Sequence, residues 1–317
     1  MNTTFDIFPA VSRRDPSIVT LGNFDGVHLG HQALFKKVIE LGAAQHLRTL
    51  ALFLWPHPRE VLTHRRIEPL TRPGQRRRLI KGMGIETCLQ LNFTPALAQV
   101  SAKTFLQTVK NHFSARILVI GPTTHLGHER SGTPERLKDL GASIGINVHV
   151  LEELSLESNV VSSSEIRQRV LDGDVAFACK AMGRPLSVRG RIVSDRGVGK
   201  TLGVPTLNLA RWQTLLPKVG VYFTRARLGG QSYFSVTNVG YRPSFESKSS
   251  LHVETHIIEP FAPQIPATSM RVAFLERFRD EMRFESKEAL VAQLRRDIER
   301  AQQARLEQKF SLGPDFL

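Results

Sequence analysis

The sequence predicts a two-part protein, in which an α/β half is followed by a β-rich half that ends in a helix. Three observations lead to this prediction. Short β-rich apolar runs alternate with helical patterns from residue 17 to about residue 182, β-rich runs then follow one another without helices between them, and one amphipathic helix closes the pattern. The pattern changes around Gly183-Arg184-Pro185, between residues 180 and 188, so we expect domains at 1–182 and 183–317.

The first half is expected to contain a mostly parallel sheet that helices cover on both faces. Its candidate strands are Ser17–Gly22, Thr49–Leu54, Ile85–Leu91, Ile117–Gly121 and Asn147–Leu151. Its candidate helices are Gln32–Gln45, Lys103–His112 and Pro134–Leu140. Ligands of such sheets collect beyond the carboxyl ends of the strands, so we expect the chemistry to lie directly after them.

The second half shows runs of β-type residues that Gly, Pro and Ser separate. The candidate strands are Val188–Ser194, Val219–Leu228, Ser232–Val239, His252–Ile258 and Met270–Leu275. Consecutive strands with turn signals predict an antiparallel barrel or sandwich. The segment Ser286–Ala304 is then expected to form a closing helix, with Ser286 as its N-cap and with Leu290, Leu294 and Ile298 on one face.

Composition narrows the range of partners and compartments. The chain has 317 residues, with 43 Lys and Arg against 29 Asp and Glu, so its formal net charge is +14 and favours polyanionic partners. Cys88 and Cys179 have neither a CxxC nor a metal-binding spacing, which is typical of a reducing compartment. No apolar run reaches the length of a membrane helix, and residues 1–14 lack a signal-peptide core. We therefore expect a cytoplasmic protein with no membrane partner.

The segment Gly22–His31 lies between the first strand and the first helix. Its glycines let the backbone approach a ligand closely, and a helix N-terminus favours negative charge. His28 and His31 lie three residues apart at the helix entry, where both can donate to phosphate oxygens. The spacing alone leaves open a phosphate site, half of a metal site, or a tight turn with two solvated histidines. The position after the first strand favours phosphate.

Two later segments are expected at the same edge of the sheet. In Ser162–Arg167, hydroxyl groups at a helix start precede Arg167, which indicates either an anion-binding cluster or an N-cap with a surface arginine. The loop Gly121–Gly127 follows the fourth candidate strand. Three such loops at one sheet edge favour a nucleotide site.

At this point the residues resemble a known family. The string Gly22-Asn23-Phe24-Asp25-Gly26-Val27-His28-Leu29-Gly30-His31, with Ser162–Arg167 and Gly173-Asp174-Val175, is similar to the adenylyltransferase module of bacterial bifunctional riboflavin kinase/FMN adenylyltransferases, also called FAD synthetases. The resemblance implies a Rossmann-like nucleotidyltransferase domain that makes FAD and pyrophosphate. It implies that His28 and His31 bind ATP phosphates and stabilise the transition state. Further implied nucleotide contacts are Gly22, Asn23, Phe24, Gly30, Ser163, Ser164 and Arg167, and the implied flavin contacts are Asp25 and Thr123.

The second half opens with a glycine-rich basic loop, Arg196–Asn208. Its Gly199-Lys200-Thr201 is reminiscent of a P-loop, but Ser194 stands where the first glycine is required and no helical pattern follows, so we reject that interpretation. The loop fits a backbone cradle for phosphates near Lys200, and the side-chain oxygens of Thr206 and Asn208 suit Mg²⁺. For this segment alone, a glycine-rich hairpin with a solvated lysine stays open.

Together with Gly220-Val221-Tyr222, Asn238–Pro243 and Val253–His256, this segment resembles the riboflavin kinase module of the same family. The resemblance implies a six-stranded antiparallel barrel with a closing helix. It places Gly199, Lys200 and Thr206 at ATP, Thr206 and Asn208 at Mg²⁺, and Glu254 as the base that takes the proton of the ribityl 5′-hydroxyl. The segment Phe278–Ser286 matches the family's C-terminal pattern and implies that Arg279 contacts the flavin. Without the family, a strand glutamate would be assigned to a solvent-facing position.

Several positions depart from the family pattern. The loop Gly121–Gly127 has Thr123, Thr124 and Leu126 where the family has an acidic or amide residue and two aromatic residues. Other departures are Leu54-Trp55-Pro56-His57-Pro58, Ser244 and Glu259–Pro266. The ATP-facing motifs are thus kept, whereas the flavin-facing motifs have changed.

We therefore expect an enzyme that phosphorylates riboflavin to FMN and adenylylates FMN to FAD, with ATP as co-substrate and Mg²⁺ as cofactor. One alternative is a paralogue with kinase activity only or with an altered flavin substrate. A second is a non-catalytic flavin-binding or RNA-binding protein, which the net charge motivates. The intact set of His28, His31, Thr206, Asn208 and Glu254 argues against it, so nucleic acid is the less favoured partner. A basic cluster away from the motifs is interpreted as a solvated helix face: Arg65, Arg66, Arg72, Arg76, Arg77 and Arg78.

Overall fold

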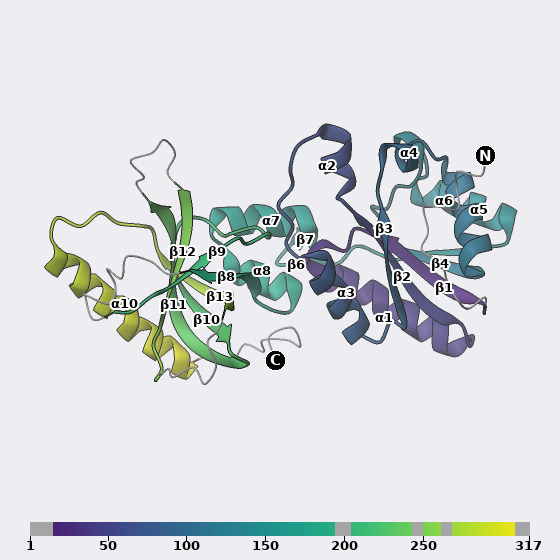
Figure 1. Cartoon of the computed structure of the whole chain (residues 1–317). Helices are drawn as coiled ribbons and strands as arrows, with labels where there is room; N and C mark the ends of the chain where they lie inside the picture. The colour runs from purple at the N-terminus through teal and green to yellow at the C-terminus, as the bar shows by residue number, and fades with distance from the viewer. Residues whose placement is uncertain (1–14, 194–203, 243–249, 261–267, 308–317) are drawn as a thin grey trace. The chain divides into compact units, whose positions relative to one another are not determined.

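The structure is a computed structural model that describes residues 15–193, 204–242, 250–260 and 268–307 (Figure 1). The chain divides into two compact units, residues 1–67 with 71–163 and residues 68–70 with 164–317. The helix α8 (Val175–Met182) and nearly all of α7 (Ser163–Asp172) precede the boundary expected from the sequence and group with the second unit. The domain bounds 1–182 and 183–317 stay a prediction.

The first unit contains the parallel sheet that the sequence predicts. Its strands are β1 (Ser17–Gly22), β2 (Arg48–Trp55), β3 (Thr87–Asn92), β4 (Ala115–Ile120) and β5 (Asn147–Val150). They pair in the order β3-β2-β1-β4-β5, and all four pairings are parallel. The predicted strand ends differ from these bounds by no more than two residues. β1 lies at the centre, so the segment after it emerges in the middle of the carboxyl edge.

Helices follow most of these strands. The three predicted helices are confirmed as α1 (Leu29–Ala44), α5 (Ala102–Phe113) and α6 (Pro134–Ile144). Because α1 begins three residues earlier than predicted, Gly30 and His31 belong to its first turn. The sequence analysis did not predict the shorter helices α2 (Pro58–Thr63) and α4 (Pro95–Ala98), or the strand pair β6 (Ser155–Leu156) and β7 (Asn159–Val160). It gave no bounds for α3 (Pro73–Gly82), although it interpreted the arginines there as a helix face.

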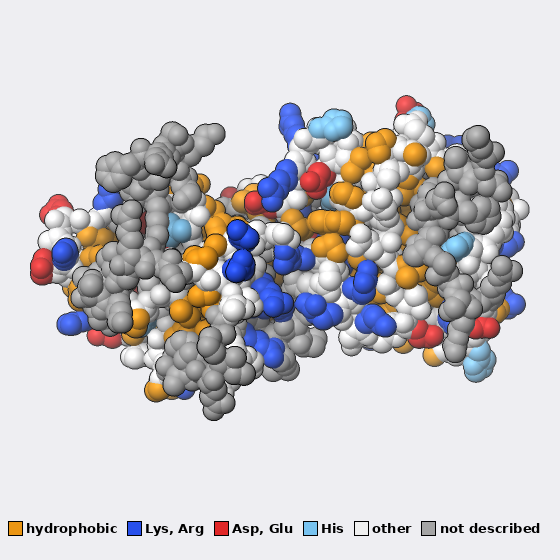
Figure 2. Space-filling model, viewed as in Figure 1, with side chains coloured by type: hydrophobic (Ala, Val, Ile, Leu, Met, Phe, Trp, Pro, Cys, Tyr) orange, Lys and Arg blue, Asp and Glu red, His pale blue; other side chains and the backbone are white. Residues whose placement is uncertain are grey.

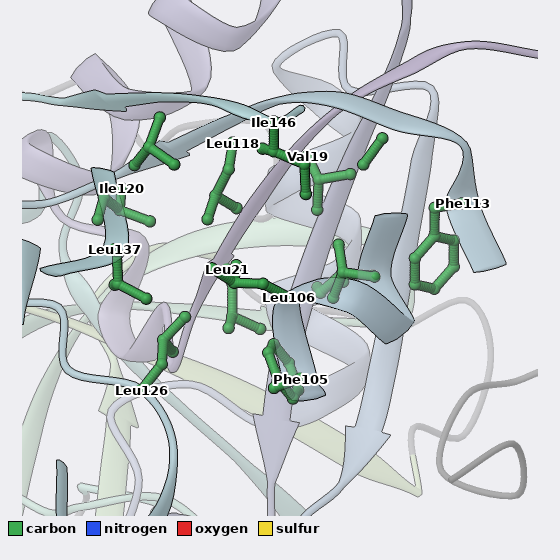
Figure 3. Close-up of a cluster of buried hydrophobic side chains, with 14 of the residues drawn as sticks. Val19, Leu21, Phe105, Leu106, Phe113, Leu118, Ile120, Leu126, Leu137 and Ile146 are labelled. Carbon is green, nitrogen blue, oxygen red and sulfur yellow. The ribbon is translucent and has the colours of Figure 1, made fainter. Parts of the chain in front are cut away.

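Side chains of β1 alternate between two buried layers, as the period of a strand requires. Val19 and Leu21 pack with Leu106 and Phe113 of α5 in one layer (Figure 3). Ile18 packs in the other layer, with Phe35 and other side chains of α1. Hydrophobic burial on both faces therefore fixes the strand, and with it the point at which the Gly22–His31 segment leaves the sheet.

The second unit contains a closed barrel of antiparallel strands, which confirms the six-stranded barrel implied by the resemblance. Its strands are β8 (Leu186–Val193), β9 (Leu207–Ala210), β10 (Gly220–Leu228), β11 (Gln231–Arg242), β12 (Ser250–Ile257) and β13 (Ser269–Arg279), in the order β10-β11-β12-β9-β8-β13. All five predicted strands begin within two residues of the observed strands, although β11 and β13 end three and four residues later than predicted, and β9 was not predicted as a strand. With only four residues, β9 offers too short a pattern to be recognised.

A row of hydroxyl groups runs through the barrel wall. Thr224 Oγ1 lies 2.7 Å from Thr237 Oγ1 and 2.8 Å from Ser235 Oγ, and Thr237 Oγ1 lies 3.0 Å from Thr255 Oγ1. All four side chains are fully buried. They satisfy one another's hydrogen bonds, so burial of these polar groups does not leave them unpaired.

The predicted closing helix is confirmed as α10 (Lys287–Glu307). Ser286 caps it, because the Ser286 hydroxyl accepts a hydrogen bond of 3.1 Å from the backbone N–H of Ala289. Ala301 is fully buried against a layer of barrel side chains that includes Phe223 and Phe278. Among the helices within the described ranges, none is both long and apolar enough to cross a membrane.

Candidate functional site

The segment after β1 has an unusual backbone. Phe24, Gly26 and Val27 have φ angles of 51°, 80° and 44°, in the left-handed region. Such a conformation is strained for a β-branched residue such as Val27, so surrounding contacts must hold it. Phe24 is buried against the Phe35 ring, with the ring centroids 4.8 Å apart. A Cβ at position 22 would lie 2.6 Å from the Phe24 ring, and this close approach explains Gly22.

His28 and His31 are brought together directly after this turn. Their rings stack with centroids 3.6 Å apart and an interplanar angle of 26°. His28 occupies the N-cap position of α1, and the Phe24 ring meets His31 edge-on at 5.2 Å. Gly30 leaves room for this stack, since a Cβ there would lie 3.2 Å from the His28 ring. Two imidazoles beside the positive end of a 16-residue helix form a site suited to an anion.

Asn23 faces a histidine from a different loop. Its Nδ2 atom lies 3.1 Å from Nε2 of His57, which is the N-cap residue of α2. Nδ1 of the same ring accepts a hydrogen bond of 3.1 Å from the backbone N–H of Arg59. The sequence analysis did not select His57 as a site residue, although it noted the Leu54–Pro58 run as a departure from the family.

Asp25 is buried, and its carboxylate already has protein partners. Its Oδ1 atom lies 2.8 Å from the Arg76 guanidinium and accepts hydrogen bonds from Thr71 N at 2.9 Å and Thr71 Oγ1 at 3.1 Å. The flavin contact expected for Asp25 stays a prediction, since the described contacts of this carboxylate are with the protein itself.

Arg76 corrects the interpretation of the basic cluster. Arg77 and Arg78 are exposed on α3, but Arg76 on the same helix is only 2 % exposed and is paired with Asp25. Arg65 and Arg66 are exposed in the segment between α2 and α3, and Arg72 is the N-cap of α3. The interpretation as a solvated helix face was therefore wrong for Arg76. It was also wrong for the cluster as a whole, because its arginines do not all lie on one helix. Figure 2 shows Lys and Arg side chains at many places on the visible surface.

The remaining predicted residues of the phosphate and flavin sites lie in three places. Ser163 is joined to the β1 segment, because its hydroxyl donates a hydrogen bond of 2.8 Å to the Asp25 carbonyl. Ser164 and Arg167 belong to α7 in the second unit, where Arg167 Nε donates to the Glu68 carbonyl at 3.4 Å. Thr123 is exposed in the loop after β4, and its carbonyl oxygen lies 2.9 Å from the His125 ring. Their ligand roles stay predictions.

In the barrel, strand register brings the kinase-motif residues together. Glu254 on β12 lies opposite Asn208 on β9 and opposite Asn238 on β11. Directly opposed side chains in an antiparallel pair are close neighbours on one face. Asn208 is buried, and the Glu254 carboxylate is 25 % exposed and lies 3.8 Å from Nε2 of His252. Thr206 is half-buried two residues before Asn208, whereas Gly199 and Lys200 lie outside the described residues.

Glu254, Asn208 and Asn238 form a row across three adjacent strands. Glu281 lies next to this row and was not selected from the sequence as a site residue. Its Oε1 atom accepts a hydrogen bond of 3.4 Å from Nδ2 of Asn238. The same oxygen lies over Gly240, where a Cβ would come within 2.0 Å of it. The Phe278–Ser286 pattern drew attention to this segment, but only the structure places Glu281 next to the row.

Arg279 is engaged by the closing helix. Its Nε and Nη2 atoms donate to the Asp297 carboxylate at distances of 2.7–3.2 Å. Asp297 is 4 % exposed, so this is a largely buried, bidentate ion pair. The flavin contact expected for Arg279 stays a prediction.

Comparisons with known proteins cover both halves of the chain. The FAD synthetase family model matches residues 11–165, and the riboflavin kinase family model matches residues 182–305. The chain belongs to the bifunctional riboflavin kinase/FMN adenylyltransferase family. The resemblance inferred from the Gly22–His31 and Leu202–Asn208 motifs is thereby confirmed.

Individual relatives align over nearly the whole chain. The bifunctional riboflavin kinase/FMN adenylyltransferase of Pseudomonas fluorescens is 29% identical over 282 residues, which cover 89% of this chain and 90% of the relative. The Escherichia coli K12 protein of the same name is 29% identical and covers 88% and 90%. A crystal structure from Streptococcus pneumoniae, described as a macrolide-efflux protein, is 30% identical with a TM-score of 0.84 and covers 95% of this chain and 97% of that one.

Proposed function

We propose that the protein phosphorylates riboflavin to FMN with ATP and adenylylates FMN to FAD with release of pyrophosphate. The observation that carries this proposal is that both family models match consecutive stretches of this one chain. Each stretch also presents its own motif side chains, His28 and His31 in the first and Asn208 and Glu254 in the second. We further propose that the enzyme acts in the cytoplasm.

For adenylyl transfer, the proposed site is the stacked pair His28 and His31 at the start of α1. An oxygen of the FMN phosphate attacks the α-phosphorus of ATP, and the bond from that phosphorus to the β-phosphate bridging oxygen breaks. Negative charge grows on the phosphoryl oxygens and on the leaving pyrophosphate. Ring N–H groups and the helix N-terminus, held in place before the reaction, stabilise that charge without reorganising.

For the kinase reaction, Glu254 is the proposed general base. Its carboxylate accepts the proton of the ribityl 5′-hydroxyl, the oxygen attacks the γ-phosphorus of ATP, and ADP leaves. Phosphoryl transfer depends mainly on positioning and charge neutralisation, so a carboxylate can serve as the base. The row of Asn208, Glu254 and Asn238 supplies positioning, since paired strands on both sides hold Glu254.

The side-chain oxygen atoms of Thr206 and Asn208 fit Mg²⁺. Thr206 and Asn208 offer neutral oxygen atoms two residues apart, and Asn208 lies opposite the Glu254 carboxylate. Hard cations prefer such oxygen ligands and take phosphate oxygens and waters for the rest of their coordination. When bound, Mg²⁺ neutralises phosphate charge. Thr206 and Asn208 are therefore the proposed protein ligands of Mg²⁺.

A kinase with weak adenylyl transfer is the second candidate. The altered loop Gly121–Gly127 favours it, because Thr123 is exposed and Leu126 is turned into the hydrophobic core. Side chains of this loop therefore offer no Phe, Tyr or Trp ring on which a flavin would stack.

The test is incubation of the pure protein with riboflavin, ATP and MgCl₂, with chromatography of FMN and FAD over time. We expect FMN to appear first and FAD to follow. FMN without FAD would support the second candidate. No turnover of riboflavin or FMN, with salt-sensitive binding of RNA, would contradict both and favour a binding protein.

A further inference from the structure

We propose that Arg76 is a positioning residue for adenylyl transfer, which fixes the turn that presents His28 and His31. This inference rests on the function proposed for those two histidines. Arg76 comes from α3, outside every motif identified in the sequence. Its side chain is only 3 % exposed, which is rare for an arginine unless its charge is paired.

The guanidinium holds both sides of the strained turn. Nη1 of Arg76 donates to the Asn23 carbonyl at 2.6 Å, and Nη2 donates to the Asp25 carboxylate at 2.8 Å. These two acceptors flank Phe24, whose φ is 51°. Nη2 also donates to the Thr71 carbonyl at 3.0 Å. A planar fork of donors can serve several acceptors in fixed directions, whereas the single ammonium of a lysine cannot reproduce this geometry.

Thr71 and two aromatic rings add further contacts. We refer to Arg76, Thr71 and these rings, which together hold the turn from Asn23 to Val27, as the clamp. Thr71 Oγ1 accepts a hydrogen bond of 2.9 Å from the backbone N–H of Gly26 and donates to Asp25, so it holds the middle of the same turn. The guanidinium carbon of Arg76 lies 5.4 Å from the ring centroid of Phe53 and 5.9 Å from that of Trp55. These contacts fix where the cation lies and exclude water from it.

The clamp and the candidate site share one short stretch of backbone. Asn23 faces His57, the Asp25 carbonyl accepts from Ser163, and Val27 is followed directly by His28. Without Arg76 the backbone from Asn23 to Val27 would relax out of the left-handed region. The His28–His31 pair would then lose its direction toward the reacting phosphate. We therefore expect the loss to fall on kcat for FAD formation.

The central experiment compares Arg76→Met with Arg77→Met, its exposed neighbour on α3. FAD formation is measured from FMN and ATP, and riboflavin phosphorylation is measured on the same samples. For Arg76→Met we expect kcat for FAD formation to fall about 100-fold, the scale of loss when reacting groups are misplaced by about 1 Å. Riboflavin phosphorylation and the Arg77→Met enzyme should be unchanged. A wild-type kcat in Arg76→Met would overturn the proposal.

A double variant separates positioning from simple stability. Arg76→Met alone leaves the Asp25 carboxylate buried without its cation and should lower Tm, whereas Asp25→Asn with Arg76→Met removes both charges and should recover much of that Tm. We expect FAD formation to stay low in the double variant, because the hydrogen bond from the Arg76 guanidinium to the Asn23 carbonyl is still missing. Recovery of kcat together with Tm would show a purely structural role and would contradict the proposal.

Two further variants complete the series. Arg76→Lys keeps the charge but not the fork, so its kcat should lie between the wild-type and Arg76→Met values. His31→Ala tests the underlying function separately. If His31→Ala forms FAD at the wild-type rate, the proposed site itself is wrong and the inference falls with it. If His31→Ala is inactive and Arg76→Met is fully active, only the inference fails.

Discussion

The two candidate sites of this protein are built in different ways. The His28–His31 site comes from one continuous segment whose strained backbone is held by α3 and the Thr71 segment. The Glu254 site comes from strand register, because its neighbours Asn208 and Asn238 lie on different strands and meet only when the barrel closes. The first site therefore depends on a few contacts around one turn, whereas the second depends on the pairing of the whole barrel.

The sharpest test of this contrast is Glu254→Gln. The amide keeps the shape but cannot take the proton, so we expect riboflavin phosphorylation to fall about 10²–10⁴-fold, the usual contribution of a general base. FMN adenylylation should be spared. Both rates are followed by chromatography from separate substrates. Glu299→Gln, on an exposed position of α10, is the matched control and should leave both rates unchanged. Equal loss of both activities would contradict two independent sites.

His31→Ala is the converse variant. The change removes one of the preorganised N–H donors that stabilise the negative charge developing on the phosphate. FAD formation should therefore fall about 10²–10³-fold. Riboflavin phosphorylation should continue, so FMN should accumulate in the same chromatographic assay. His112→Ala, in the last turn of α5, provides the control. Loss of phosphorylation in His31→Ala would mean that the two halves do not act separately.

Asp297→Asn probes the dependence of the second site on the whole barrel. The change weakens the bidentate contact that joins Arg279 to α10 and should lower the free energy of unfolding by about 1–3 kcal/mol. Urea denaturation measures this loss, and Asp172→Asn at an exposed helix position is the control. We expect riboflavin phosphorylation to decline with barrel stability while adenylylation persists. An undiminished unfolding free energy would show that the contact contributes nothing.

The smallest effect concerns the two cysteines, one in each unit. Burial raises the pKa of the Cys88 thiol and of the Cys179 thiol from 9.0 to about 11. Both thiols should therefore react slowly with iodoacetamide at pH 8.5 in the folded protein and rapidly in urea. The unfolded thiols ionise at lower pH than the buried thiols. The contribution of the two protonated, buried thiols to the free energy of unfolding is therefore present below pH 9 and is lost as the pH rises towards 11.

The same labelling compares the two halves directly when the modified cysteines are identified by mass spectrometry. In Asp297→Asn, Cys179 should be labelled faster while Cys88 keeps its wild-type rate. Equal acceleration at both cysteines would indicate that the barrel contact also controls the first unit, which would remove the contrast.

What the sequence could predict follows from the same contrast. The Gly22–His31 segment is contiguous, so its glycines and histidines were recognisable before the fold was known. Arg76 was missed because its partner Asn23 lies 53 residues away and because five other arginines nearby suggested a solvent-facing cluster. Burial of a charge depends on tertiary packing and leaves no periodic signal.

The barrel shows the other limit. The alternation of β-type residues predicted most of its strands, and Glu254 was selected only through the family resemblance. The opposition of Glu254 to Asn208 and Asn238 is a matter of register, and a shift of one residue would turn each of these side chains to the other face. The contact of Glu281 with Asn238 joins segments 43 residues apart and could not be derived from either segment alone.

The Arg279–Asp297 pair has a consequence for ligand exchange. A guanidinium that already donates twice to a buried carboxylate cannot turn to a flavin without giving up part of that contact. A ligand that turns the Arg279 guanidinium away from Asp297 must therefore compete with Asp297 and loosen the attachment of α10 to the barrel. Occupancy of the barrel by such a ligand and detachment of the C-terminal helix would then be thermodynamically linked, each favouring the other to the same extent.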